Sequence, residues 1–366
     1  MHVYYIVIVL AVGAALLSQR SAASRDRGLG YLGGDTVDDL GGKSLSRWIF
    51  AVLAGLVLTF VAAFRWRVGT DYDTYALVYD RYKSVPWSDL RPLREPGINV
   101  IAKIGQFIND DYASMFAVAA VITVGLTVRT IYRNSTAFAL SIALYILTST
   151  WQGSFNGIRQ YVACAILFAG HRYILERKFR KYLLVVLVAS LFHISAIVMV
   201  LLYWVPRARL GIGRVVILLG LTVAAGAAYR YAGDIIDAIK QGDQSTGSYF
   251  ARHVSRLRIV AAFGPSVFYA LFTRKDRLDE AGFFYANVLF VNAAILLASS
   301  GSAYLARFAI YTGVYSALAI PRLFNMEDRR FVALATVVTV AIFGVFWYFD
   351  TTSTPSLENF HWINQR

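Results

Sequence analysis

The 366-residue sequence contains a single cysteine, Cys164. One cysteine cannot form an intramolecular disulfide, and it lacks the companions that a cysteine-based zinc or iron–sulfur site needs. Charged residues are also scarce, at 16%, whereas hydrophobic residues make up 57%. Soluble domains carry about 25% charged and about 45–50% apolar residues. The composition therefore predicts a protein that is embedded in a lipid bilayer.

Familiar nucleotide-binding and hydrolase patterns are missing too. The sequence has no P-loop, no H-E-x-x-H and no G-x-S-x-G, so nucleotide-driven transport and those hydrolase chemistries have no support. GLGYLG, from Gly28 to Gly33, matches G-x-G-x-x-G, but it follows no strand and precedes no apolar helix, so we expect a loop. The net charge is +14, yet the basic residues lie between apolar runs, which favours membrane topology over a nucleic-acid partner.

Long apolar runs are what the sequence does contain. No alternating barrel pattern appears, and only helices or closed barrels satisfy their backbone in lipid, so we expect an all-α polytopic membrane protein. Residues 1–349 are expected to form one membrane domain of about ten transmembrane helices. The predicted spans lie near residues 3–17, 47–64, 112–132, 137–151, 158–175, 215–229, 259–272, 281–299, 308–321 and 331–349.

Two further apolar stretches do not fit single spans. Residues 97–108 are short and contain Lys103, which predicts a short interfacial helix. Residues 182–205 have His193 near their centre, where an ionisable group is costly in lipid. A single crossing would place three basic loops opposite the basic segment 176–181, against the positive-inside rule. We therefore predict a re-entrant helical hairpin that turns at Phe192-His193.

This topology places the chain in the cytoplasmic (inner) membrane with both termini extracytoplasmic. Residues 18–46 form a cytoplasmic loop, while 65–96, 230–258 and the tail 350–366 lie outside. The outer loops are rich in arginine and aromatic residues. Arginine suits a diphosphate because its planar donors bind two oxygens at once and stay charged. The alternative is an ordinary solvated surface with an interfacial belt of tyrosine and tryptophan.

Arg159 and Arg307 are the most informative basic residues, because each lies at the outer end of an otherwise apolar helix. As the alternative to a functional role, either side chain could simply extend to the membrane–water interface and place its charge there. Asn156 and Gln160 accompany Arg159 and make a polar helix end that lipid would not favour. No metal site is required: Asp71 and Asp73 have the spacing of an Asp-x-Asp pair, but arginines can replace a divalent cation at a diphosphate.

Five short motifs in order resemble the EpsG family of Wzy-like exopolysaccharide polymerases. They are FRWRVGTDYDTY, REPG, NGIRQYVA, SLFHISAIV and a late Arg-x-x-x-Tyr, and together they cover roughly residues 60–315. The residues at the family positions are Arg65, Gly69, Asp71, Tyr72, Tyr75, Glu95, Pro96, Gly97, Asn156, Arg159, Gln160, His193, Ser195, Ala196, Arg307 and Tyr311. Residues 1–46 and the region around 252–258 do not map onto the pattern.

The resemblance implies a GT-C-like helical bundle and a glycosyltransferase that joins polyprenyl-diphosphate-linked repeat units, such as those on undecaprenyl diphosphate, outside the membrane. It needs no cofactor. A flippase and a chain-length regulator of the same pathway would be partners. Asp71, Glu95 and His193 are candidates for activating the acceptor hydroxyl. The candidates for binding diphosphate or glycan are Arg65, Arg159, Arg307, Arg256, Arg258, Tyr72, Tyr75, Asn156, Gln160 and Tyr311.

Several alternatives stay open. Asp71 could hold Arg65, and Glu95 could hold Arg94, as structural partners only. A transporter that flips lipid-linked oligosaccharide could line a cavity with the same arginines. A single-addition membrane glycosyltransferase or ligase, or a polymerase of O-antigen, would also share these features.

Overall fold

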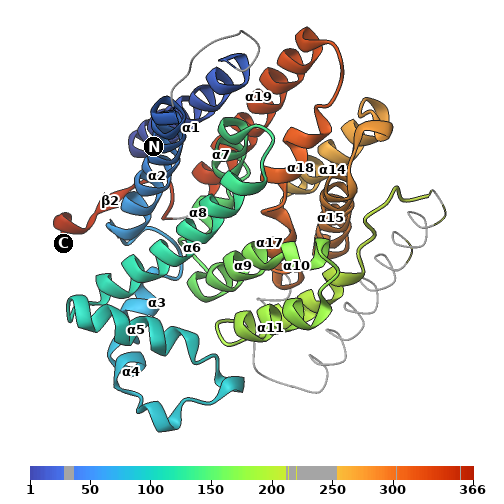
Figure 1. Ribbon diagram of the computed structural model, residues 1–366. Coiled ribbons are helices and arrows are strands. Elements are labelled where there is room, and N and C mark those ends of the chain that lie inside the picture. Colours follow the sequence, from blue (N-terminus) through green and yellow to red (C-terminus); the bar gives the residue numbers. More distant parts are fainter. Residues whose placement is uncertain (29–36, 212, 214–219, 221–253, 302, 355) are drawn as a thin grey trace.

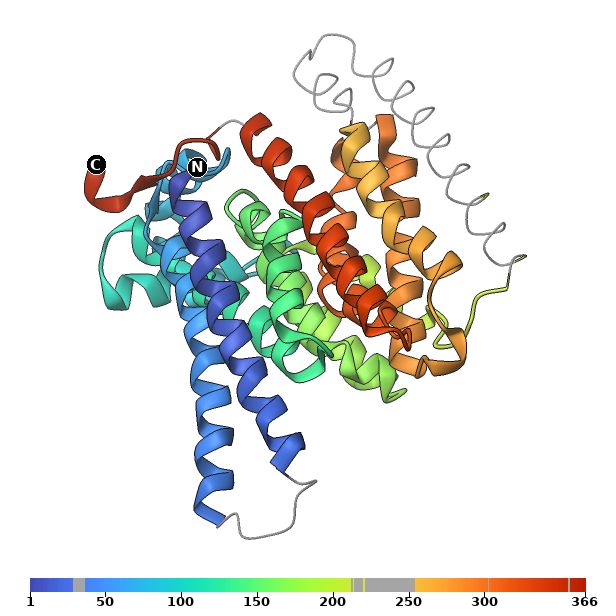
Figure 2. The same ribbon diagram turned by 90° about the horizontal axis from the view of Figure 1, so that it is seen from above.

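The computed structural model describes residues 1–28, 37–211, 213, 220, 254–301, 303–354 and 356–366. These residues form a bundle of helices around an apolar core (Figures 1 and 2). Among the described residues, five helices are long and apolar enough to cross a membrane, with candidate spans His2–Ser21, Leu45–Ala63, Tyr112–Asn134, Glu280–Ala298 and Arg329–Ser353. They belong to α1 (His2–Gly28), α2 (Val37–Ala63), α6 (Tyr112–Asn134), α15 (Glu280–Ala298) and α19 (Arg329–Ser353). The protein is thus an all-α membrane protein.

In the described part of the chain, the spans predicted at 137–151, 158–175 and 308–321 are interrupted, and the one at 259–272 lies in a single helix of 16 residues. A helix needs about 20 residues to cross the hydrocarbon core, and these pieces are shorter, so the expected count of about ten is not reproduced. The pieces are α7 (Phe138–Leu147), α8 (Thr150–Gly153), α9 (Ile158–Gly170), α10 (Arg172–Leu175), α14 (Arg256–Leu271), η5 (Ser299–Gly301), α16 (Ala303–Ala306), α17 (Ala309–Gly313) and α18 (Ser316–Leu323). The span predicted at 215–229 and most of the loop 230–258 lie outside the described residues.

The helices α1 and α2 lie side by side as a long antiparallel pair (Figure 2). Both extend into the segment 18–46, which we had expected to be a loop. The pair packs on α6 and α7, and α6 begins at the N-cap Asp111, whose carboxylate accepts a hydrogen bond from the backbone N–H of Ala113 (2.8 Å). Helix α9 packs against both α6 and α11 (Phe179–Ser190).

The segment 65–96 is folded rather than extended. It contains β1 (Arg65–Trp66), α3 (Tyr72–Leu77), α4 (Tyr79–Ser84), η1 (Trp87–Asp89) and η2 (Pro92–Arg94). Helix α5 (Gly97–Ile108) follows, so the predicted short helix is present, and its position at the membrane interface stays a prediction. It is amphipathic: Ile98 and Ile101 are buried, whereas Phe107 is 95% exposed.

The chain reverses direction where the hairpin was predicted. Helix α11 (Phe179–Ser190) ends just before Phe192-His193, and the 3₁₀ helix η3 (Ile194–Trp204) packs back against it. The Tyr182 hydroxyl donates a hydrogen bond to the Met199 carbonyl (2.8 Å), which joins the two arms. The hairpin is therefore present, and its depth in a membrane stays a prediction.

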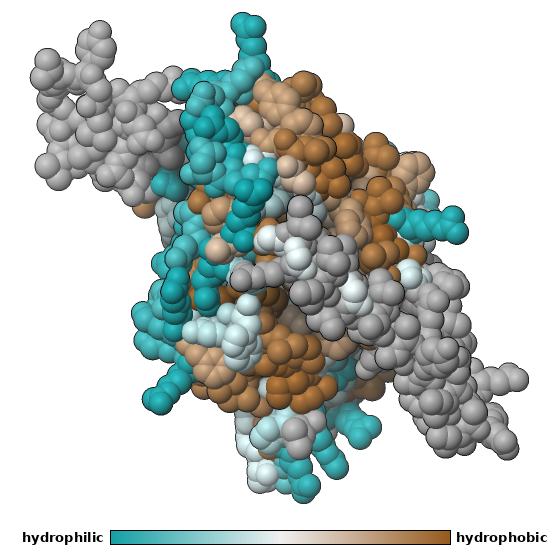
Figure 3. Space-filling view, turned by 90° about the vertical axis from the view of Figure 1, so that its right-hand side faces the viewer, coloured by the Kyte–Doolittle hydropathy of each residue, from teal (hydrophilic) through white to brown (hydrophobic). Residues whose placement is uncertain are grey.

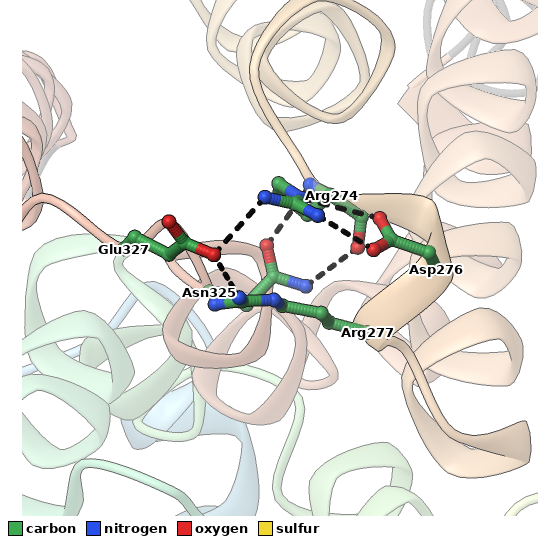
Figure 4. Close-up of polar contacts among 5 residues, drawn as sticks. All are labelled: Arg274, Asp276, Arg277, Asn325 and Glu327. Carbon is green, nitrogen blue, oxygen red and sulfur yellow. Dashed lines mark hydrogen bonds and ion pairs between the residues drawn. The ribbon is translucent and has the colours of Figure 1, made fainter.

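Basic loops gather at one end of the bundle. Arg274 joins the loop that contains η4 (Lys275–Arg277) to the loop before α19, because it contacts both Asp276 and Glu327 (Figure 4). The side-chain amide of Asn325 also donates a hydrogen bond to the Arg274 carbonyl. Arg177 also reaches Glu280 (2.8 Å) at the start of α15. The segment 176–181 and the loops 273–280 and 322–330 therefore share one end, as the charge argument required.

The opposite end holds the N-terminus and the tail. Strand β2 (His361–Trp362) pairs antiparallel with β1, and η6 (Ile363–Gln365) follows it. The Met1 ammonium donates to the Glu358 carbonyl (3.0 Å), so both ends of the chain lie together (Figure 1). On the face seen in Figure 3, apolar side chains form broad patches, and hydrophilic ones gather along one edge and at the bottom.

Candidate functional site

Glu95 lies at the centre of a polar cluster because of the two residues that follow it. Its backbone is left-handed (φ 52°, ψ 57°), which is unusual outside glycine. Gly97 then donates its N–H to the Leu191 carbonyl (2.9 Å). A Cβ on Gly97 would lie 2.3 Å from the ring of Phe192, so only glycine allows this approach. The Glu-Pro-Gly motif thereby docks the start of α5 onto the tip of the hairpin.

The carboxylate of Glu95 accepts three hydrogen bonds. One oxygen accepts from His193 Nδ1 and from the backbone N–H of Ile194, both at 2.8 Å. The other oxygen pairs with the guanidinium of Arg159. Burial alone would raise the pKa of Glu95, but the hydrogen bonds from His193 and Ile194 and the charge of Arg159 outweigh it and lower the pKa. Glu95 is therefore an ionised partner of Arg159 and His193, not of Arg94.

The Asn-x-x-Arg-Gln motif contacts three separate parts of the chain. The Asn156 side-chain oxygen accepts from the Thr70 N–H (2.7 Å), next to Asp71. Arg159 reaches Glu95 and also donates to the Tyr75 hydroxyl (3.4 Å). Gln160 donates to the carbonyl of Arg307 (2.8 Å). Asn156 and the first turn of α9 thus fix the segment 65–96 and the broken helix α16–α17 relative to each other.

Two further contacts complete this network. The hydroxyls of Ser195 and Tyr311 lie 2.8 Å apart, so the Phe-His-x-Ser-Ala motif is joined to the Arg-x-x-x-Tyr motif. Gly69 has φ +108°, and a Cβ there would lie 2.4 Å from the Phe155 carbonyl oxygen. A glycine is required so that the loop before Asp71 can reach α9. All five motifs therefore meet in space.

These motifs surround a cavity of about 400 Å³. Ligand pockets are typically about 300–1,000 Å³. Eight of the predicted site residues line it: Asp71, Tyr75, Asn156, Arg159, Gln160, His193, Arg258 and Arg307. Part of the lining is polar: Ser149, in a left-handed conformation (φ 57°), lies at the break between α7 and α8, and Asn292 comes from α15. Such breaks are tolerated at membrane depth where they line a cavity.

Arginine is the main source of charge in this lining. Arg159, Arg258 and Arg307 contribute three positive charges, and Asp71 and Asp350 contribute two negative charges. Arg258 donates to both carboxylate oxygens of Asp350 (2.7 and 3.0 Å). Asp350, together with Tyr161 and Gln152, belongs to the site although sequence reasoning missed it. Its position at the end of a long apolar span is the signal that could have identified it.

Arg65 is a correction to the predicted set. It is 3% exposed and does not line the cavity. Its guanidinium donates to the carbonyls of Val68, Ala62 and Phe155 and lies over the rings of Phe116 and Phe155, 4.9 Å from each centroid. Arg65 therefore holds the backbone after α2 and is not available to a diphosphate.

Four other predicted residues also lie outside the lining, and one of them is Glu95, which contacts the lining residues Arg159 and His193. Tyr72 is buried and stacks on Phe116 with ring centroids 4.3 Å apart. Arg256 is exposed at the first residue of α14. Tyr311 is buried, and its hydroxyl contacts Ser195 and Gln160.

The Asp-x-Asp pair does not form a shared ion site. Asp71 lines the cavity, whereas Asp73 pairs with Arg67 (3.3 Å) and lines a different hollow. Within the part of the chain that the structure describes, no group of three or more His, Cys, Asp or Glu side chains could hold a metal ion.

A comparison with known protein families gives a match over most of the chain. The model of the EpsG family matches residues 48–364, which include all five motifs. No curated protein and no solved structure matches the chain. Since the matched region covers most of the sequence, the chain belongs to the EpsG family.

Proposed function

We propose that the protein is a polysaccharide polymerase that joins polyprenyl-diphosphate-linked repeat units on the outer face of the cytoplasmic membrane. One observation carries this proposal: Arg159, Arg258 and Arg307 line the same cavity as His193, which is hydrogen-bonded to Glu95. Cationic donors and an oriented base are the two things that glycosyl transfer from a diphosphate needs.

The arginines would stabilise the leaving group. Negative charge grows on the diphosphate as the bond from the anomeric carbon to the phosphate oxygen breaks. Preorganised donors aimed at such charge typically contribute several kcal/mol, or about 10²–10³ in rate for one donor. Arg159 and Arg258 are themselves held by Glu95 and Asp350, so their donors are positioned before the substrate arrives.

His193 would activate the acceptor. An ionised carboxylate can only accept hydrogen bonds, so the contact with Glu95 places the proton of a neutral His193 on Nδ1. Nε2 is then left to accept a proton. The acceptor hydroxyl oxygen bonds to the anomeric carbon, its proton passes to Nε2, and the lipid diphosphate leaves with the electron pair. Asp71 is the second candidate base, because it lines the same cavity.

The test is a purified-protein assay with lipid-linked oligosaccharide, comparing wild type with Arg307→Ala. We expect long products from the wild type and a loss of about 10²–10³ in joining rate in the variant. Arg177→Ala is the matched control, since Arg177 pairs with Glu280 at the other end of the bundle. Normal polymer from Arg307→Ala at normal protein level would refute the diphosphate role.

The same assay separates the rival functions. A single addition to each acceptor would identify a transferase or ligase. Substrate that is relocated across the bilayer but chemically unchanged would identify a transporter. In cells, a separate flippase and chain-length regulator acting on the same lipid-linked units are expected partners of the polymerase.

A further inference from the structure

A second hollow of about 510 Å³ lies on the outer segment beside the cavity. Seven residues line it: Trp66, Arg67, Asp73, Ala76, Leu77, Tyr112 and Arg366. None of them lines the cavity described above. From this hollow we infer a binding site for the glycan product, an extension of the proposed polymerase that rests on that function.

The hollow adjoins the cavity through one short helix. Asp71, the residue before α3, lines the cavity, and Asp73, in the first turn of α3, lines the second hollow. Two residues of extended chain span at most about 7 Å. A glycan that leaves the cavity at Asp71 therefore meets the second hollow within one or two sugar lengths.

The lining has the chemistry of a site for neutral sugar. Trp66 and Tyr112 supply aromatic surface, and an arginine lies against each ring: Arg67 is 5.4 Å from the Trp66 centroid and Arg366 is 4.3 Å from the Tyr112 centroid. Rings of this kind pack on apolar sugar faces while paired polar groups bind hydroxyls. The groups are mostly accessible, since Arg67 and Asp73 have 62% and 64% of their side chains exposed.

The charged groups of this hollow are paired with one another. Arg67 is paired with Asp73 (3.3 Å), and Arg366 donates to both carboxylate oxygens of Asp111 (2.6 Å each). Two positive charges are thus matched by two negative charges, and an uncharged glycan can bind beside these pairs without displacing either partner.

The backbone also holds Trp66 and Arg67 in a specific arrangement. Arg67 adopts φ 51°, a left-handed conformation that is unfavourable for a residue other than glycine. Trp66, the residue before Arg67, is held in place by its pairing with His361 in the β1–β2 ladder. Strain that is maintained in this way is typical of ligand sites.

The experiment compares Trp66→Ala with wild type in two assays. The first follows joining of lipid-linked repeat units from the host cell and the length of the products. The second measures binding of the polymer purified from the same cells. We expect Trp66→Ala to form the first joined product at the wild-type rate, but to bind polymer about 2- to 10-fold more weakly, as for the loss of one aromatic contact, and to make shorter chains.

Two variants serve as controls. Trp66→Phe keeps an aromatic face and should restore chain length, which separates glycan contact from any loss of the β1–β2 pairing. Trp87→Ala removes another exposed tryptophan of the outer segment, 62% exposed and outside both hollows, and should behave as wild type.

The outcomes are distinct. Unchanged polymer binding and chain length in Trp66→Ala would overturn the inference. The inference would also be overturned if Trp66→Ala lost binding to vesicles of anionic lipid but still bound polymer as the wild type does. That result would identify Trp66 as a contact to the membrane interface or to a lipid headgroup. If the wild type joins no repeat units at all, the polymerase proposal fails, and the polymer-binding assay still tests the second hollow.

Discussion

Replacing Glu95 by glutamine removes one charge and one acceptor from the centre of the site while keeping the side-chain size. In the wild type, one oxygen serves His193 and Ile194 and the other serves Arg159. Glutamine has one oxygen. If it faces His193 and Ile194, its NH₂ group points at the donors of Arg159, so the ion pair is lost.

The size of the effect follows from that contact. A hydrogen bond to a charged group is worth about 1.5–3 kcal/mol. Arg159 has 35% of its side chain exposed, so water replaces part of the loss and the lower value applies. About 1.4 kcal/mol corresponds to a tenfold change in rate. His193 also exchanges an ionised acceptor for a neutral one, so we expect the joining rate of Glu95→Gln to fall about 10- to 100-fold.

The assay is the initial rate of joining of lipid-linked units by purified protein, at equal amounts of folded enzyme. Glu280→Gln is the matched control, because Glu280 is paired with Arg177 (2.8 Å) and is 60% exposed at the other end of the bundle. Since Glu95 acts through both His193 and Arg159, only the part of the loss that runs through His193 should disappear in a His193→Ala background, so the two losses should be less than additive in the double variant. Glu95→Gln at the wild-type rate, or fully additive losses in the double variant, would refute this reasoning.

Two further predictions concern the surroundings of the site. Arg65→Lys should lower the thermal stability and the amount of folded protein, because the single nitrogen of lysine cannot reach the three carbonyls that Nε, Nη1 and Nη2 of Arg65 contact separately. The activity per folded molecule should change little, and a large loss of specific activity at normal stability would instead support a direct role in binding. The hydrogen bond from Arg366 lowers the pKa of Asp111, so this contact stabilises the folded tail above the unfolded pKa of about 3.9 and is lost as the pH falls through the lower folded value. Thermal unfolding from pH 7 to pH 3 should show a loss in wild type that Asp111→Asn lacks, and parallel curves would contradict the assignment.

The sequence identified the residue types of the site but not their partners. Sequence reasoning makes Glu95 a candidate base and leaves open a structural pairing with Arg94, and in the structure the carboxylate pairs with Arg159 and His193. Arg65 occupies a family position, but burial and three carbonyl acceptors make it structural. These pairings join residues about a hundred positions apart in some cases, and nothing local in the sequence encodes which cation meets which anion.

The sequence by itself determined that the protein is helical, that it lies in a membrane and that its chain turns back at Phe192-His193. Composition, run length and loop charge are local quantities, and the cost of unsatisfied backbone or charge in lipid acts on them directly. Only the tertiary structure decided where helices break and which side chains share the cavity. Those outcomes depend on close contacts, such as Gly97 against Phe192, that exist only after distant segments have packed together.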